Sequence, residues 1–199
     1  TCVLPICIWI GDGSVHQDGI RFHINRDDVL NHVDTLSREL FDTGVDYTWK
    51  EGCYEVVVHS HEVKRWWLSN FGDAKESSGS AHVPDPIWSA DYECIHAFLR
   101  GLFSTDGTLT KGRYPRLYSS SERLIDETLQ LMLGVGIPAT KWEWENDERD
   151  YFSVAPTDAT GLERFADRVG YVDTRTDEMS ESIAENAPEP TTFGTVTGE

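Results

Sequence analysis

The stretch Phe98–Gly107, which reads FLRGLFSTDG, carries the strongest indication of the fold. Apolar residues run through it, and two small residues, Gly101 and Thr105, stand four positions apart. Two helices that meet along their length need small residues at this spacing, because these let the backbones approach. The stretch ends in Asp106 and Gly107, a pair typical of a helix end followed by a turn. It therefore predicts a helix that packs against a similar one.

A second, more degenerate copy lies near the N-terminus. It covers Pro5–Gly13, has Cys7 and Gly11 as its small residues, and also ends in Asp-Gly. When the two Asp-Gly pairs are superposed, the sequences that follow them align at a period of about 94 residues. A repeat of this length is too long for a solenoid and indicates two pseudo-symmetric halves.

Each half repeats one order of predicted elements. Strands are expected at 15–25 and 108–119, long helices with apolar periodicity at 27–41 and 122–133, hairpins at 45–59 and 140–155, and shorter helices at 62–71 and 158–169. The chain therefore divides into a first half (1–72), a linker (73–90), a second half (91–172) and a C-terminal segment (173–199). In that last segment a short helix is expected at 176–185, followed by an acidic flexible tail.

The charge of the chain is strongly acidic. Asp and Glu number 35 against 17 Lys and Arg, which gives a formal net charge of −18. Such a surface looks like adaptation to a salt-rich cytoplasm, where salt screens self-repulsion. On its face this charge argues against a nucleic-acid partner. Two resolutions stay open: the acidic residues concentrate on helices away from the binding face, or nucleic-acid binding has been lost.

Membrane insertion and thiol chemistry are not expected. No apolar run approaches the ~18 residues that a membrane-spanning helix needs, so a cytoplasmic protein is expected. The four cysteines form no C-x-x-C pair. They are expected to be buried free thiols rather than zinc ligands.

On these motifs the chain resembles the LAGLIDADG homing endonucleases, specifically the dodecapeptide (DOD) type embedded in inteins. The resemblance covers about residues 3 to 185. It implies an α+β fold of two pseudo-symmetric αββαββα halves, whose saddle-shaped antiparallel sheets lie in the major groove of double-stranded DNA. It also implies a pseudo-dimeric monomer. Together with the acidic composition, it suggests a halophilic archaeon as the source.

The two Asp-Gly pairs carry the expected chemistry. Side-by-side helix ends would bring Asp12 and Asp106 within a few Å, and carboxylates beside free helix carbonyls suit Mg²⁺. The resemblance implies that these aspartates and the carbonyls of Gly11 and Thr105 hold the metal. It also implies a basic residue near the attacked phosphate, for which Lys64 is chosen over His59 and His61. The second half has no lysine in the matching stretch 153–157, which leaves cutting of one strand open.

The DNA contacts are expected on the outward positions of the strands. Arginines that alternate with apolar residues are the best candidates, and the expected set is Arg21, His23, Arg113, Arg116, Tyr118 and Lys141. The adjacent Trp66 and Trp67 are expected in the core rather than stacked on bases.

Two functions follow from this reading. The first is a site-specific, Mg²⁺-dependent DNA endonuclease that cuts both strands and is associated with an intein or an intron. The alternative is a non-catalytic nucleic-acid binder, either an RNA maturase or the decayed remnant of an intein endonuclease. The residues of a self-splicing intein are not visible, so either a free-standing nuclease or a fragment of a larger intein is expected.

Overall fold

The computed structural model describes residues 4–145 and 150–185. In the first half the elements are α1 (Leu4–Asp12), β1 (Gly13–His16), β2 (Gly19–Ile24), α2 (Asp27–Phe41), β3 (Asp46–Lys50), β4 (Cys53–His59) and α3 (His61–Phe71). In the second half they are α5 (Tyr92–Thr105), β5 (Gly107–Thr110), β6 (Tyr114–Ser119), α6 (Glu122–Gly134), β7 (Ala139–Glu145), β8 (Asp150–Pro156) and α7 (Ala159–Arg168). The predicted αββαββα repeat is confirmed.

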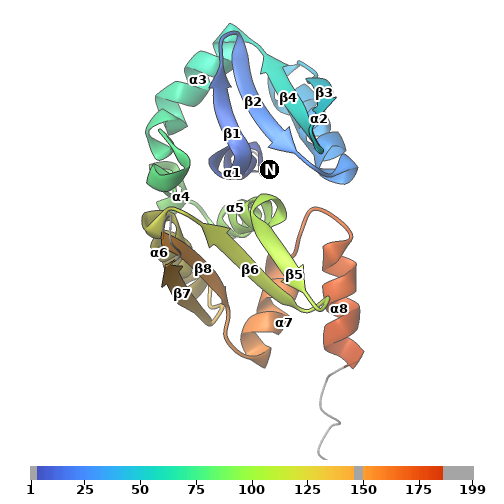
Figure 1. Ribbon diagram of the computed structural model, residues 1–199, viewed down its shortest axis with the longest axis vertical. Coiled ribbons are helices and arrows are strands. Elements are labelled where there is room, and N and C mark those ends of the chain that lie inside the picture. The colour runs from blue at the N-terminus through green and yellow to red at the C-terminus, as the bar shows by residue number, and fades with distance from the viewer. Residues whose placement is uncertain (1–3, 146–149, 186–199) are drawn as a thin grey trace, which may run out of the picture.

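The two halves stack end to end, with α1 and α5 side by side at their junction (Figure 1). Helix α1 is apolar around its whole circumference, and the side chains from Ile6 to Ile10 are all buried. A helix that is apolar all round has to be enclosed by protein. The Cys7 thiol donates to the carbonyl of Ala97 on α5 at 3.8 Å. The predicted close approach of two small-residue helices is therefore present.

Each half carries a four-stranded antiparallel sheet. The strand orders are β1-β2-β4-β3 and β5-β6-β8-β7, so the two sheets have the same topology. In β2, the buried residues Ile20, Phe22 and Ile24 alternate with Arg21 and His23. This alternation separates a core face, covered by helices, from an outer face. The predicted strands 15–25 and 108–119 are each a hairpin, because turns at 17–18 and 111–113 interrupt them.

The segment between α3 and α5 is tied to the body of the protein. It contains two short 3-10 helices, Gly72–Ala74 and Ser78–Ser80, and α4 (Asp85–Trp88). Ala74, Ala81 and Val83 are fully or almost fully buried. The hydroxyl of Ser121 donates to the Ala81 carbonyl at 2.6 Å, which fixes this segment against α6. Its path is thus determined by packing.

The C-terminal helix α8 (Arg175–Glu185) confirms the helix predicted at 176–185, and it packs against α7. The expected tail (186–199) and residues 146–149 of the hairpin expected at 140–155 lie outside the described residues. None of the helices in the described part of the chain is long and apolar enough to span a membrane.

The expectation that Trp66, Trp67 and the cysteines are buried is only partly right. Trp67 is 2% exposed and belongs to the core, whereas Trp66 is 46% exposed. The two residues are adjacent on α3, so their side chains point about 100° apart around the helix. In the described part of the chain Cys7, Cys53 and Cys94 form no disulfide, and of these three only Cys7 is buried. Burial raises the pKa of the Cys7 thiol.

Candidate active site

The ends of α1 and α5 meet at Gly11. Asp106 caps the C-terminus of α5, where its N–H donates to the Leu102 carbonyl at 3.1 Å. A methyl group at Gly11 would lie 2.7 Å from the hydroxyl oxygen of Thr105 and 2.9 Å from the carboxyl carbon of Asp106. The Asp106 carboxylate therefore rests directly on the last turn of α1. Asp12 ends that same turn, but its side chain lies outside the described part of the structure.

Lys75 brings a cation to the same helix end. Its ammonium donates to the carbonyl of Trp9 at 3.2 Å and to the carbonyl of Gly11. The last carbonyls of a helix have no partner within the helix and carry partial negative charge, so they attract a cation. The ammonium thus lies at the Gly11 carbonyl, which was expected to bind metal.

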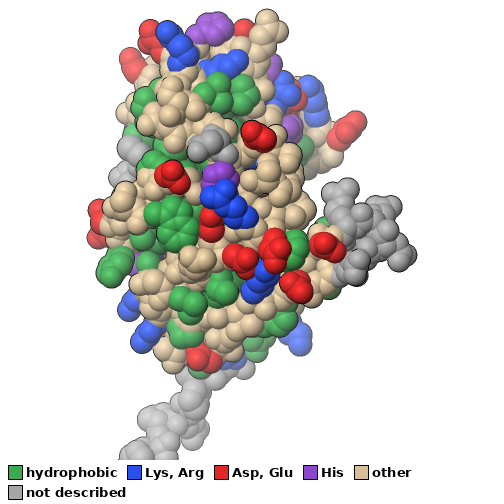
Figure 2. Space-filling view, turned by 90° about the vertical axis from the view of Figure 1, so that its left-hand side faces the viewer, with side chains coloured by type: hydrophobic (Ala, Val, Ile, Leu, Met, Phe, Trp, Pro, Cys, Tyr) green, Lys and Arg blue, Asp and Glu red, His purple; other side chains and the backbone are tan. Residues whose placement is uncertain are grey.

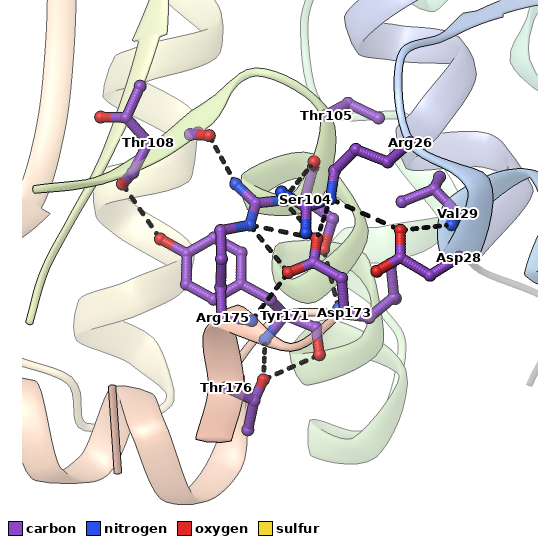
Figure 3. Close-up of polar contacts among 12 residues, drawn as sticks. Arg26, Asp28, Val29, Ser104, Thr105, Thr108, Tyr171, Asp173, Arg175 and Thr176 are labelled. Atoms are coloured by element: carbon purple, nitrogen blue, oxygen red, sulfur yellow. Dashed lines mark hydrogen bonds and ion pairs between the residues drawn. The ribbon is translucent and has the colours of Figure 1, made fainter. Parts of the chain in front are cut away.

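Arg175 occupies the corresponding place in the second half. Its guanidinium donates to the carbonyls of Ser104, at 2.7 Å, and Gly107, at 2.8 Å (Figure 3). It also forms a bidentate ion pair with a buried carboxylate, Asp173, at 2.6 Å. Asp173 also pairs with Arg26 of the first half at 3.2 Å. Burial alone would raise the pKa of Asp173, but the hydrogen bonds from Arg175 and the charge of Arg26 hold it below its ordinary value.

The structure does not bring Lys64 to the ends of α1 and α5. Its ammonium donates to the carbonyls of His16, at 2.8 Å, and Gln17, at 2.9 Å. These two carbonyls lie at the end of β1 and in the β1–β2 turn, whereas Asp12 precedes the opposite end of β1. The basic side chain at the end of α1 is Lys75, which lies in the segment that follows α3.

Four of the predicted DNA contacts lie on the outer faces of the sheets. In the first half these are Arg21, which faces Glu55 at 3.8 Å, and the exposed His23. In the second half Arg116 lies over the Trp142 ring at 4.3 Å, and Tyr118 follows it on the same face of β6.

The two remaining contacts lie elsewhere. Arg113 is in the β5–β6 turn, beside the ring of Tyr114. Lys141 is on the face of β7 that packs against α6, where it pairs with Glu122 at 2.7 Å and Asp126 at 2.8 Å. The structure therefore does not group Lys141 with the other candidates.

The outer faces of the two sheets carry few acidic residues. By strand register, the charged residues on the outer faces of the described strands are Arg21, Lys50 and Arg116 against Asp46 and Glu55. These faces are nearly balanced in a chain of formal net charge −18. In the space-filling view a group of acidic side chains surrounds a basic one just below the middle of the face shown (Figure 2). The near balance of charge on the outer faces of the sheets agrees with the first resolution, in which the acidic residues lie mainly off the binding face.

Two hollows flank Gly11. One, of about 440 Å³, is lined among others by Lys75, His23 and Ser14. The other, of about 150 Å³, is lined by Asp106, Tyr118 and Ser119 among others. The site thus opens toward both sheets.

The groups at this site fit a hard divalent cation. The oxygens there are the Asp106 carboxylate, the Thr105 hydroxyl and the Gly11 carbonyl, and Mg²⁺ prefers oxygen ligands of these kinds. The ammonium of Lys75 already shows that the helix carbonyls attract positive charge.

Sequence reasoning missed Lys75 and Arg175. The signal was the repeat itself, because each residue follows the glycine that closes the third helix of its half, Gly72 or Gly170, by three to five positions.

Comparison with known proteins agrees with the fold described above. Residues 93–170 match the LAGLIDADG-like domain. Two curated proteins match most of the chain, a DNA polymerase from Thermococcus hydrothermalis (27% identity over 89% of this chain) and the replicative DNA helicase DnaB from Synechocystis (28% over 82%). The chain spans only 12% and 21% of the length of these two proteins.

Solved structures match over nearly the whole chain. The crystal structure of I-DmoI in complex with DNA and Ca gives a TM-score of 0.68 at 12% identity, covering 90% of this chain and 96% of that one. The complex with DNA and Mn gives 0.65 at 12% identity, covering 84% and 94%. The chain therefore has the LAGLIDADG homing-endonuclease fold, with a LAGLIDADG-like domain in its second half.

Proposed function

We propose that this chain is a homing endonuclease that cuts both strands of a long DNA target as a pseudo-dimeric monomer with Mg²⁺. The observation that carries this proposal is the meeting of a carboxylate and an ammonium at Gly11. The Asp106 carboxylate lies against this residue, and Lys75 donates to its carbonyl. If the junction of α1 and α5 only held the two halves together, it would not need a carboxylate and a cation at the same helix end.

The residues have separate roles in this proposal. Asp12, Asp106 and the carbonyls of Gly11 and Thr105 would hold the metal, which when bound would supply activated water and stabilise the leaving oxygen. Lys75 would place positive charge where negative charge develops on the attacked phosphate. Arg175 is the corresponding cation in the second half, where it shares the Asp173 carboxylate with Arg26.

The DNA would lie along the outer faces of the two sheets. These faces carry Arg21, His23, Arg116 and Tyr118, and they lack the acidic excess of the rest of the chain. The similar protein I-DmoI was solved with DNA and with Ca or Mn, which supports this choice of partner and a divalent metal.

The similarity to parts of larger proteins is explained if this chain is an element that is inserted into other proteins. The chain matches short parts of two proteins with different activities, a polymerase and a helicase. We therefore propose an intein-associated nuclease. The acidic, lysine-poor composition supports a halophilic archaeal source and a salt-rich cytoplasm.

Cleavage of an uninterrupted allele tests this function. The substrate is plasmid DNA carrying the intein-free or intron-free form of the host gene, in Mg²⁺ and a series of KCl concentrations. We expect a double-strand break with wild type and none with Asp106→Asn. DNA binding without cleavage at every salt concentration would contradict the nuclease, and equal cleavage by Asp106→Asn would contradict the site.

One observation favours the non-catalytic alternative. The outer face of the second sheet carries exposed aromatic rings, with Trp142, Trp144 and Tyr118 each 37–40% exposed. Aromatic side chains on a sheet stack with unpaired bases. An RNA maturase or a decayed endonuclease would bind single-stranded RNA through these rings and lose that binding in Trp142→Ala, without cutting DNA.

A further inference from the structure

Three potential metal ligands gather at the end of the first sheet that lies away from the junction of α1 and α5. They are His16 at the end of β1, Asp18 in the β1–β2 turn and His59 at the end of β4. One ligand atom from each side chain lies within 4.8 Å of the other two. This end of the molecule is at the top of Figure 1, and histidine side chains are visible at the corresponding end in Figure 2.

Strand pairing explains why the two imidazoles meet. His16 pairs with Gly19 on one side, and Gly19 pairs with His59 on the other. Gly19 has no side chain to separate them, and a methyl group there would lie 2.9 Å from the carbonyl carbon of Val58. The two rings consequently meet edge to face, with centroids 5.6 Å apart.

Helix α3 holds the turn that carries Asp18 in place. Lys64 on α3 donates to the carbonyls of His16 and Gln17, and the N–H of Asp18 donates to Nδ1 of His16 at 3.3 Å. The Lys64 ammonium is thus bound to the backbone of the turn. The sheet and α3 together position the three ligand side chains.

Two neighbouring side chains, Asp46 and His61, lie beside these ligands. Asp46 lies 3.6 Å from Nε2 of His59, and Nε2 of His61 lies 4.0 Å from the Asp18 carboxylate. Metal-binding histidines usually have a carboxylate on the nitrogen that does not bind the metal. Asp46 provides that arrangement and leaves Nδ1 of His59 for a metal.

We propose that His16, Asp18 and His59 bind a borderline divalent transition-metal ion such as Zn²⁺. Two imidazoles and one carboxylate suit zinc, cobalt, nickel or copper, whereas Mg²⁺ prefers oxygen ligands alone. The site is therefore chemically distinct from the all-oxygen site at Gly11. Three protein ligands leave a coordination position open, as in zinc sites that bind a further ligand.

The location suggests what the open position would contact. His16, Gly19 and His59 lie on the same face of the sheet as Arg21. If the proposed function holds and DNA lies along this face, the bound ion would add positive charge there and accept a phosphate oxygen. An acidic chain in high salt would gain affinity from such a contact.

Titration with Co²⁺, followed by its visible absorption, tests the site without DNA. The full chain is titrated in excess Mg²⁺, which occupies all-oxygen sites. We expect one Co²⁺ per chain, displaced by Zn²⁺, and at least a tenfold loss of affinity in both His16→Gln and His59→Gln. The matched control is His32→Gln, which removes an exposed histidine on α2 outside the site and should keep the wild-type affinity.

The possible outcomes distinguish failure of the metal-site proposal from failure of the proposed nuclease function. Wild type without a bound Co²⁺, or equal affinity in wild type, His16→Gln and His59→Gln, would overturn the proposal. Circular dichroism establishes that both variants are folded, and the two substitutions lie on different strands, so one misfolded variant leaves the other to decide. DNA affinity measured with and without Zn²⁺ then tests the phosphate contact. The effect should be lost in His59→Gln and kept in Asp106→Asn, whose cleavage reports separately on the nuclease.

Discussion

At the scale of single residues, two lysines of the first half have different surroundings. Lys75 donates to the end of α1, and Lys64 donates to the β1–β2 turn. We expect Lys75→Met to lower the single-turnover rate of DNA cleavage by about 10²-fold, because a cation beside the attacked phosphate is lost. Rates are measured at saturating Mg²⁺ and DNA, so that weaker binding does not contribute.

Lys64→Met is the matched control, since it removes the same charge from the same half. It should leave the cleavage rate unchanged while lowering the midpoint of urea unfolding, because two carbonyls of the turn lose their donor. If Lys64→Met lost cleavage and Lys75→Met kept it, the earlier expectation for Lys64 would be right and the role given to Lys75 wrong.

At the scale of elements, the contact between α1 and α5 depends on Gly11. A side chain at this position would overlap the Asp106 carboxylate and the Thr105 hydroxyl. We expect Gly11→Ala to cost about 1–3 kcal/mol of unfolding free energy, as overpacking typically does. It should also weaken Mn²⁺ binding, because the carboxylate has to move. Urea unfolding and Mn²⁺ titration measure the two effects.

Gly134→Ala serves as the comparison. Gly134 ends α6, and a methyl group there would meet nothing within 4 Å. Alanine is favoured over glycine in a helix by up to about 1 kcal/mol, so this variant should be as stable as wild type or more stable. Equal unfolding curves for both glycine variants would mean that α1 and α5 do not pack as described.

Features that arise from local sequence patterns could be predicted, whereas features that depend on long-range contacts could not. Helical periodicity and the repeated Asp-Gly ends are local patterns, so α2, α6 and the approach of α1 to α5 were predictable. Lys75 and Arg175 were not, because their contacts depend on how the chain returns after α3 and α7. The face on which Lys141 lies depends on strand register, in which a shift of one residue exchanges the two faces.

At the scale of the whole molecule, DNA affinity should depend on the outer faces of the sheets. Arg116→Ala removes a cation from such a face, and we expect it to weaken DNA binding and to reduce the salt dependence by about one charge. Lys141→Ala removes a cation that already pairs with Glu122 and Asp126 on the other face, so its affinity should stay close to that of wild type. Binding isotherms over a KCl series compare them. Equal losses in both variants would place the DNA elsewhere.

Coupling between the two halves depends on Asp173, whose side chain is fully buried between Arg26 and Arg175. Asp173→Asn removes the carboxylate paired with Arg175 and one of the two carboxylates beside Arg26, and it should cost about 3 kcal/mol of unfolding free energy. Asp34→Asn is the control, because it breaks an exposed pair with Arg38 and should cost only about 0.2–1 kcal/mol.

The pKa of Asp173 sets where this stabilisation disappears. That pKa is lowered in the folded protein, so the contribution is complete above the unfolded value of about 3.9 and is lost as the pH falls through the folded value. Urea unfolding of wild type and Asp173→Asn should therefore differ most near neutral pH and converge in acid. A difference that does not change down to the lowest pH at which the protein folds would show that the carboxylate charge does not join the halves.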